Sequence, residues 1–166
     1  MKKLYCGGSF PFDYQNDGYL EQVSRDYRAR ILGSSDLLLQ RSNGILLCSD
    51  LTYIGPFYFE APEMLDTDII CAERQMVENC SHAVFLLEDG CCPGTITELT
   101  YASLLKKEIA VFYIRKSDAE ETESSLHNPC WYPILFSTIQ NPHTHIFPCC
   151  SRETATEKIL EYIHTI

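Results

Sequence analysis

The sequence predicts an α/β domain built on a doubly wound parallel sheet of about five strands, with helices on both faces. Apolar segments of strand length alternate with longer segments whose apolar residues recur at helical spacing. Segments 83–87 and 109–114 are apolar throughout, as in central parallel strands covered on both faces. Loops containing glycine follow several of these strands, at the edge where parallel sheets place their ligand loops.

The first third of the chain is expected to contain two strands and a helix. Residues 3–6 form a short apolar run that ends at two glycines, and apolar residues at helical spacing follow over 19–32. Residues 52–54 lead into a Gly-Pro breaker, which indicates a strand that turns into an aromatic loop. Segments 37–39 and 45–47 could each be a strand or the edge of a buried loop, and the sequence does not decide between them.

A helix is expected from Thr67 and Asp68, as its N-terminal capping residues, to about Cys80. Its inner face would carry four apolar residues, namely Ile69, Ile70, Met76 and Val77.

The second half repeats the alternation. A helix is expected from residue 95 to about 106, followed by the strand at 109–114. Residues 131–139 fit either a helix or an irregular cover. A last strand at 145–147 and a closing helix at 151–166, with Ile159, Leu160 and Ile163 facing inward, complete the fold.

Length and charge limit the classes of partner. The chain has 166 residues, which predicts a single domain over 1–166. It carries 13 Lys and Arg against 23 Asp and Glu, a formal net charge of -10. A surface of this sign repels polyanions, so no nucleic acid polymer is expected as a partner. A small anion remains compatible, because a helix N-terminus binds one phosphate locally.

The cysteines and the lack of targeting signals predict a cytoplasmic protein with reduced thiols. No apolar run follows the two lysines at the start, and no segment approaches the ~20 apolar residues of a membrane span. Nine cysteines, an odd number, indicate free thiols. The best cluster of metal-ligating types, Cys149 and Cys150 with His143 and His145, lacks C-x-x-C spacing, so no metal site is expected.

The most informative segment is the turn into the helix expected at residues 95–106. Gly94 would let a ligand approach the backbone, and Glu98 follows in the first helical turn. In one interpretation Thr95 and Glu98 form a capping box and nothing catalytic follows. In the other, the helix dipole keeps Glu98 ionised and Glu98 acts as a nucleophile. Local chemistry leaves both interpretations open.

Residues 94–102 also resemble the signature of the nucleoside 2-deoxyribosyltransferase family, a Gly-rich turn followed by Glu-Leu and a small residue. Residues 5–10, with Asp13, Gln15, Asn16 and Tyr19, are similar to that family's first strand, substrate loop and helix start. Residues 53–58 are similar to an aromatic Gly-Pro-Phe stretch found in some branches. The resemblance covers the strand ends across residues 1–115, and the last fifty residues add little.

The resemblance implies a flavodoxin-like fold and a retaining glycosyl transfer. Glu98 would attack the anomeric carbon of a 2-deoxynucleoside, the base would leave, and another base or water would take the sugar. Tyr5 would donate a hydrogen bond that orients Glu98, although a half-buried structural tyrosine is an equal alternative. A small nucleoside or nucleotide would contact nine residues, namely Gly7, Ser9, Phe10, Asp13, Phe57, Glu73, Asp89, Gly94 and Thr95. No cofactor is expected, and the family implies a homo-oligomer, a dimer or higher, in which a neighbouring subunit helps to close the pocket.

The sequence departs from the family at two acidic positions. One falls on Ala72 or Arg74, with Glu73 between them, and the other falls on Cys92. Glu73, Glu88 or Asp89 would have to protonate the leaving base, and each of them is otherwise a solvated surface charge.

Three alternatives stay open beside the transferase. The related deoxynucleoside 5-monophosphate N-glycosidases keep the nucleophile, and Thr95, Thr97 and the free amides of the helix start could bind a phosphate, although the alternating Ser and Gly of that group are absent. A non-catalytic nucleotide-binding module would have Arg74 and Cys92 lining its pocket. A flavodoxin-like redox protein would bind flavin and absorb visible light.

Overall fold

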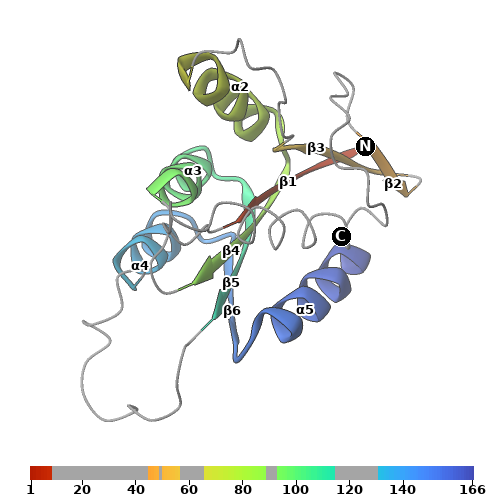
Figure 1. Cartoon of the computed structure of the whole chain (residues 1–166), viewed down its shortest axis with the longest axis vertical. Coiled ribbons are helices and arrows are strands. Elements are labelled where there is room, and N and C mark those ends of the chain that lie inside the picture. Colours follow the sequence, from red (N-terminus) through yellow and green to blue (C-terminus); the bar gives the residue numbers. More distant parts are fainter. Residues whose placement is uncertain (9–44, 49, 57–65, 89–92, 115–130) are drawn as a thin grey trace, which may run out of the picture.

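The computed structural model describes residues 1–8, 45–48, 50–56, 66–88, 93–114 and 131–166. Within these residues one sheet has the strand order β2-β3-β1-β4-β5-β6 (Figure 1). The strands are β1 Lys2–Gly8, β2 Ile45–Cys48, β3 Leu51–Gly55, β4 His82–Glu88, β5 Glu108–Ile114 and β6 Thr144–Cys149. Strands β3, β1, β4, β5 and β6 pair in parallel, whereas β2 pairs with β3 in antiparallel.

The predicted parallel sheet of five strands is confirmed. Numbered along the chain, its parallel strands are ordered 2-1-3-4-5, the flavodoxin-like order of doubly wound sheets. The open choice at residues 45–47 is resolved as a strand, β2, which adds an antiparallel edge to the parallel sheet.

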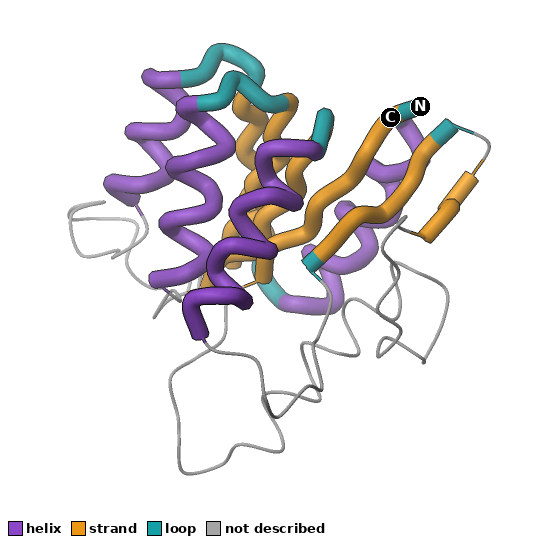
Figure 2. The backbone as a smooth tube through the Cα atoms, turned by 90° about the horizontal axis from the view of Figure 1, so that it is seen from above, coloured by secondary structure: helices purple, strands orange, loops and turns teal. Residues whose placement is uncertain are grey.

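Helices cover both faces of the sheet (Figures 1 and 2). They are α2 Asp66–Asn79, α3 Pro93–Leu104, α4 Trp131–Gln140 and α5 Arg152–Thr165. Helices α2, α3 and α4 lie on one face and α5 lies on the other. The segment at 131–139, left open between helix and irregular cover, is therefore a helix.

Successive residues of each central strand enter different apolar clusters, because side chains alternate between the faces of a sheet. The cluster on the α5 face includes Leu4, Cys6, Val84, Leu86, Phe112 and Ile159. The cluster on the face of α2, α3 and α4 includes Tyr5, Val77, Phe85, Leu87, Leu99 and Ile134. Both faces of β4 and β5 are buried between the strand ends, which explains why residues 83–87 and 109–114 are apolar throughout.

Three details of the expected helices are corrected. Helix α2 begins at Asp66, so Thr67 and Asp68 lie in its first turn and do not cap it. Ile70 is 64% exposed and does not belong to the inner face, although Met76 and Val77 do. Helix α3 begins at Pro93, two residues before the expected start, because proline is favoured at the first helical position.

The closing helix follows expectation. Ser151 caps α5 by accepting a hydrogen bond from the Thr154 amide, and Ile159 and Ile163 are buried. The Lys2 ammonium group donates to the backbone carbonyl of Ile166, so the two chain ends lie side by side (Figures 1 and 2). In the described part of the chain, no helix has the length and apolar character needed to cross a membrane. The helix expected at 19–32 and the segment 37–39 lie outside the described residues.

Candidate active site

The carboxyl ends of β1 and β4 lie side by side, with Gly7 opposite Phe85 and Gly8 opposite Leu86. From β1 the strand order continues to β3 on one side and to β4 on the other, which makes this the topological switch point of the sheet. Doubly wound proteins bind their ligands at such points, outside the carboxyl ends of the strands. Helix α3 starts at the same edge, because only four residues separate it from the end of β4.

The Glu98 carboxylate lies over Gly7. A Cβ atom added to Gly7 would be 2.9 Å from Glu98 Oε2 and 2.6 Å from the ring of Phe85. Only a residue without a side chain leaves room for both groups, which gives Gly7 a steric role. The structure thus brings together Gly7 and Glu98, two residues 91 positions apart that the sequence predicts to be in one site.

Tyr5 belongs to the same group of side chains. It lies two residues before Gly7 on β1 and therefore faces the same side of the sheet. Its side chain is fully buried, and its ring centroid is 6.2 Å from that of Phe85, whose ring edge adjoins Gly7. Tyr5 is thus a wholly buried residue beneath the carboxyl edge, not a half-buried one.

Thr95 attaches the start of α3 to the end of β1. Its hydroxyl donates a buried hydrogen bond of 2.6 Å to the carbonyl oxygen of Gly8. Thr95 is the third residue of α3, not the residue before the helix, so the interpretation of Thr95 and Glu98 as a capping box is wrong. The Thr95 hydroxyl instead provides a hydrogen-bond donor for the Gly8 carbonyl, which is buried beneath α3 and has no access to water.

Glu98 is the sixth residue of α3 and lies in its second turn, whereas the sequence predicts the first turn. The field of the helix dipole falls off within the first turn. The dipole therefore stabilises the Glu98 carboxylate less than the sequence predicts. Gly94, by contrast, is exposed in the first turn of α3.

Glu73 lies on the sheet-facing side of α2. It precedes Met76 and Val77 by one helical turn, so the three residues share a face. Val77 is buried in the cluster that contains Tyr5 and Phe85, and the Met76 side chain lies against Gly55 at the end of β3. Because α2 connects the end of β3 to the start of β4, its earlier residues lie nearer the carboxyl edge. The half-buried Glu73 therefore stands one turn closer to this edge than Met76.

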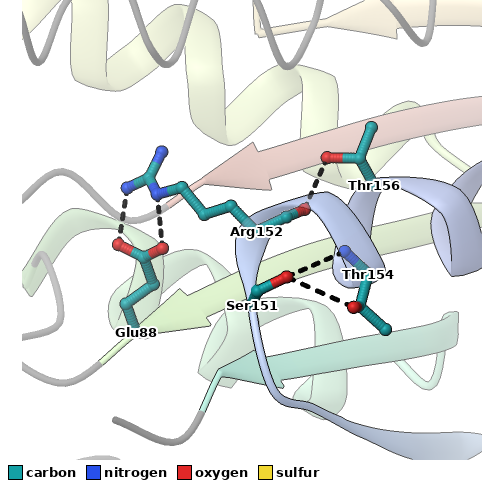
Figure 3. A network of polar contacts seen from close by, with 5 residues as sticks. All are labelled: Glu88, Ser151, Arg152, Thr154 and Thr156. Atoms are coloured by element: carbon teal, nitrogen blue, oxygen red, sulfur yellow. Dashed lines mark hydrogen bonds and ion pairs between the residues drawn. The ribbon is translucent and has the colours of Figure 1, made fainter.

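Glu88, another candidate acid, is paired with an arginine (Figure 3). Arg152 Nε and Nη2 each lie 2.5 Å from a different oxygen of the Glu88 carboxylate, a bidentate arrangement. The side chains are only 15% and 26% exposed for Glu88 and Arg152, respectively. Glu88 alternates with Leu87 and so points to the α5 face, whereas Glu98 lies on the α3 face.

Arg74 lies on the outer side of α2. Its Nε atom is 3.4 Å from Glu78 Oε1, and Glu78 accepts a hydrogen bond of 2.5 Å from the Tyr101 hydroxyl. This exposed cluster links α2 to α3. Arg74 and Glu73, neighbours in sequence, therefore occupy different faces of the helix, and the side chain that faces the sheet is the carboxylate.

The remaining predicted residues Ser9, Phe10, Asp13, Phe57 and Asp89 lie outside the described part of the chain, as does Cys92. No three His, Cys, Asp or Glu side chains gather to hold a metal ion in the portion that the structure describes. His145 and Cys150 are exposed, whereas Cys149 is buried.

Two residues at this edge, Phe85 and Arg152, are not predicted as site residues from the sequence. Phe85 has the pattern of a core residue in an apolar strand, and no local signal distinguishes it from its neighbours. Arg152 offers a signal, because it is a cation in the first turn of α5, where the helix dipole disfavours positive charge. Such a local conflict indicates a tertiary partner, here Glu88.

Comparison with known proteins gives fold similarity without sequence similarity. No family model matches the sequence, and no curated protein sequence matches it. Among solved structures, the CMP N-glycosidase BcmB of Clostridium botulinum superposes with a TM-score of 0.56 at 12% identity, over 97% of this chain and 99% of that chain. A probable GTP-binding protein, engB, superposes with a TM-score of 0.48 at 11% identity, over 98% and 97% of the two chains. The chain therefore has a fold similar to that of a CMP N-glycosidase over almost its whole length.

Proposed function

We propose that this chain is a nucleoside 2-deoxyribosyltransferase-like enzyme that cleaves or exchanges the N-glycosidic bond of 2-deoxynucleosides or their monophosphates. Glu98 is the proposed nucleophile, and it forms an ester with the anomeric carbon as the base leaves. A second base or water then attacks the same carbon and restores the carboxylate. The proposal covers residues 1–166 as one domain of a cytoplasmic homo-oligomer.

The observation that carries the proposal is the contact between Glu98 and Gly7. A carboxylate at the switch point of a doubly wound sheet stands where a ligand of this fold binds. The absence of a side chain at Gly7 lets the Glu98 carboxylate lie directly against the backbone at the end of β1. Gly94, exposed in the first turn of α3, would let the sugar approach the backbone.

The proposed role of Tyr5 is to orient Glu98 by a hydrogen bond from its hydroxyl. Support comes from its place on β1, two residues before Gly7 and on the same face. A buried tyrosine hydroxyl that donates to a carboxylate fixes the oxygen that attacks.

Glu73 is the proposed acid that protonates the leaving base, together with Asp89 as a further substrate contact. Glu73 is preferred to Glu88 because Glu88 points to the α5 face, where it pairs with Arg152, whereas Glu73 shares the sheet-facing side of α2 with Met76. Ser9, Phe10, Asp13 and Phe57 stay proposed contacts of the sugar and base.

Hydrolysis of a monophosphate is the second candidate, and the fold similarity to a CMP N-glycosidase favours it. In that case water takes the sugar and a phosphate group is required on the substrate. Thr95 and Thr97 each donate their hydroxyl proton to a backbone carbonyl, that of Gly8 and that of Pro93, but only Thr97 is exposed and so within reach of a phosphate.

The test compares wild type with Glu98→Gln on a panel of deoxynucleosides and 5-monophosphates, with and without a free acceptor base, and follows base release by chromatography. Glu157→Gln, on the exposed side of α5, is the matched carboxylate control. We expect release in wild type and Glu157→Gln, its loss in Glu98→Gln, and a sugar adduct on the Glu98 peptide by mass spectrometry. Dependence on acceptor identifies a transferase, and dependence on phosphate identifies the hydrolase. Folded wild type that binds nucleotides but turns over no donor is a binding module, and the enzyme proposal is then wrong.

A further inference from the structure

Tyr101 of α3 and Glu78 of α2 join the two helices that carry the proposed nucleophile and the proposed acid. The Tyr101 hydroxyl donates a hydrogen bond of 2.5 Å to Glu78 Oε1. This bond is the main reason that the pKa of Tyr101 is raised above its usual value, so the hydroxyl stays protonated and able to donate. Helices α2 and α3 are neighbours on one face of the sheet (Figure 1), and the bond crosses the boundary between them.

Tyr101 shares a flank of α3 with Glu98. The two residues are three positions apart and so are neighbours on the helix surface. The side of α3 that faces the core is formed by other residues, among them Leu99 and Ala102, which are fully buried. Because Tyr101 reaches α2 from this flank, Glu98 lies on the α2 side of its helix as well as over Gly7.

Glu73 and Glu98 lie at similar heights on their helices relative to this bond. Glu73 precedes Glu78 by five residues, and Glu98 precedes Tyr101 by three. Both helices run from the carboxyl edge of the sheet to its amino edge, because each connects the end of one strand to the start of the next. At about 1.5 Å per residue, the difference of two residues amounts to about 3 Å. The bond therefore joins the helices about one turn below the two carboxylates.

Helix α3 has anchors of its own, whereas α2 is buried through its second half. Thr95 ties the start of α3 to Gly8, and the side of α3 that faces the sheet is buried. In α2, Val77 of the second half is fully buried, whereas Ile70 of the first half is 64% exposed. Loss of the Tyr101 bond would therefore shift α2 and leave α3 in place.

Lys107, which follows α3, fixes the last turn of α2. Its ammonium group donates to the backbone carbonyls of Glu78 and Cys80, at 2.7 and 2.8 Å. These bonds hold the backbone at the end of α2, whereas the Tyr101 bond holds a side chain on its flank. A helix held at this end alone can tilt, and a tilt displaces Glu73 more than the last turn.

We propose that Tyr101 is a positioning residue that acts through Glu78 and holds α2 so that the Glu73 carboxyl group faces the leaving base. The inference rests on the proposed function and specifies which step the bond serves. Glu98 forms a bond to the anomeric carbon, the electron pair of the N-glycosidic bond goes to the base, and Glu73 transfers its proton to that base. A shift of α2 slows only the proton transfer, because Glu98 belongs to α3.

The experiment removes the hydroxyl with Tyr101→Phe and compares donors that differ in their need for an acid. The neutral donors are 2-deoxyguanosine, 2-deoxycytidine and their 5-monophosphates, whose bases leave with a proton from the enzyme. The corresponding 7-methylguanine and 3-methylcytosine donors carry a positive charge on the base, which therefore leaves as a neutral molecule without that proton. We expect kcat to fall about tenfold for neutral donors, with KM unchanged, and to stay unchanged for cationic donors. Glu73→Gln should show the same selectivity with a larger loss.

Variants of Glu78 test the bond itself. Glu78→Ala removes the acceptor and should lose as much as Tyr101→Phe, and the double variant should lose no more than either, because all three lack the same bond. Glu78→Gln keeps an acceptor oxygen and should retain most of the rate. Tyr132→Phe is the matched control, since Tyr132 is an exposed tyrosine on α4, and it should behave as wild type.

Hydrogen exchange of the backbone amides measures the attachment of α2 without turnover. In Tyr101→Phe the amides of α2 should exchange severalfold faster, and those of α3 at the wild-type rate. Unchanged exchange in α2, or an equal loss of kcat on neutral and cationic donors, overturns the role of Tyr101 and leaves the proposed reaction standing. A wild type without turnover overturns the proposed reaction and this role with it, even where exchange shows that the bond holds α2.

Discussion

The hydroxyl of Thr95 donates a 2.6 Å hydrogen bond to the carbonyl oxygen of Gly8, which joins the first turn of α3 to the last residue of β1. Both groups are withdrawn from water, so the bond also satisfies a carbonyl that would otherwise be buried without a donor. Glu98 lies three residues further along α3 and Gly7 one residue earlier on β1. The bond therefore fixes the approach of the Glu98 carboxylate to Gly7.

Thr95→Val keeps the shape of the side chain and removes the donor. We expect the free energy of unfolding to fall by about 2 kcal/mol, because the Gly8 carbonyl loses its donor in a buried place. Thr95→Ser should lose much less. Thr97→Val is the control, since the Thr97 hydroxyl bonds to the Pro93 carbonyl in an exposed position. Urea unfolding of the four proteins tests this, and equal losses for Thr95→Val and Thr97→Val would contradict it.

Gly7→Ala tests the steric role of Gly7. The added methyl would lie 2.6 Å from the Phe85 ring and 2.9 Å from Glu98 Oε2, so the ring and the carboxylate must both move. We expect a loss of about 1–3 kcal/mol of stability, typical of overpacking. Combination with Phe85→Leu should recover part of it, because the smaller side chain makes room.

The control for Gly7→Ala is Gly94→Ala, at an exposed helical position. Alanine there is favoured over glycine by up to about 1 kcal/mol, so stability should stay the same or rise. Thermal unfolding of the set distinguishes the two positions. If Gly7→Ala is as stable as wild type, the space beside Glu98 is larger than the structure indicates.

The sequence predicts the parallel sheet well because its information is local. In β4 and β5, burial on both faces requires apolar residues at every position of 83–87 and 109–114, and this pattern can be recognised within each segment alone. The short β2 has only four residues, and its antiparallel pairing to β3 depends on a neighbouring strand. Ile70 shows that apolar character alone does not predict burial. An exposed isoleucine on the outer side of a helix cannot be distinguished in the sequence from a buried one.

The site is less predictable, because its contacts connect distant parts of the chain. The motif at 94–102 predicts that Glu98 matters, and its contact with Gly7 depends on how α3 packs on β1. Thr95 has the local pattern of a capping residue, yet its hydroxyl serves a strand carbonyl 87 positions earlier in the chain. The partner of Glu88 is Arg152, 64 positions away. The only sequence signal for this pair is that Arg152 is a cation in the first turn of a helix.

The bidentate pair of Arg152 and Glu88 should be energetically coupled. Removal of one partner leaves the other charge largely buried, so Arg152→Ala and Glu88→Ala should each cost on the order of 2 kcal/mol. The double variant should cost clearly less than the sum, with a coupling energy of about 1–3 kcal/mol. Urea unfolding in a double-mutant cycle measures this coupling.

The pair of Arg74 and Glu78 provides the control cycle, since it is much more exposed and its atoms are 3.4 Å apart. Exposed pairs at this helical spacing contribute about 0.3–0.5 kcal/mol. The two cycles should therefore differ severalfold. Equal coupling energies would mean that burial does not strengthen the pair between α5 and β4.

The described cysteines should differ sharply in reactivity toward thiol reagents. Burial is the main reason that the pKa of Cys80 is raised to about 11, so this thiol is almost entirely protonated at neutral pH. Cys71 and Cys150 are exposed. Alkylation followed by peptide mass spectrometry should label Cys71 and Cys150 rapidly and Cys80 only after unfolding. Labelling of Cys80 in the native protein at the same rate would contradict its burial.

His82 should make the stability of the fold depend on pH. Burial, and next the nearby Lys2 ammonium, lower the pKa of His82 below 6.5, while Glu108 opposes them. Below pH 6.5 His82 is protonated in the unfolded chain but remains neutral in the folded chain. The free energy of unfolding therefore decreases as pH falls from 6.5 to the lowered pKa of His82 in the folded protein. His82→Gln should flatten the decline in urea midpoint between neutral and mildly acid pH, whereas His145→Gln, at an exposed position of β6, should not. An unchanged slope in His82→Gln would mean that other groups cause the acid sensitivity.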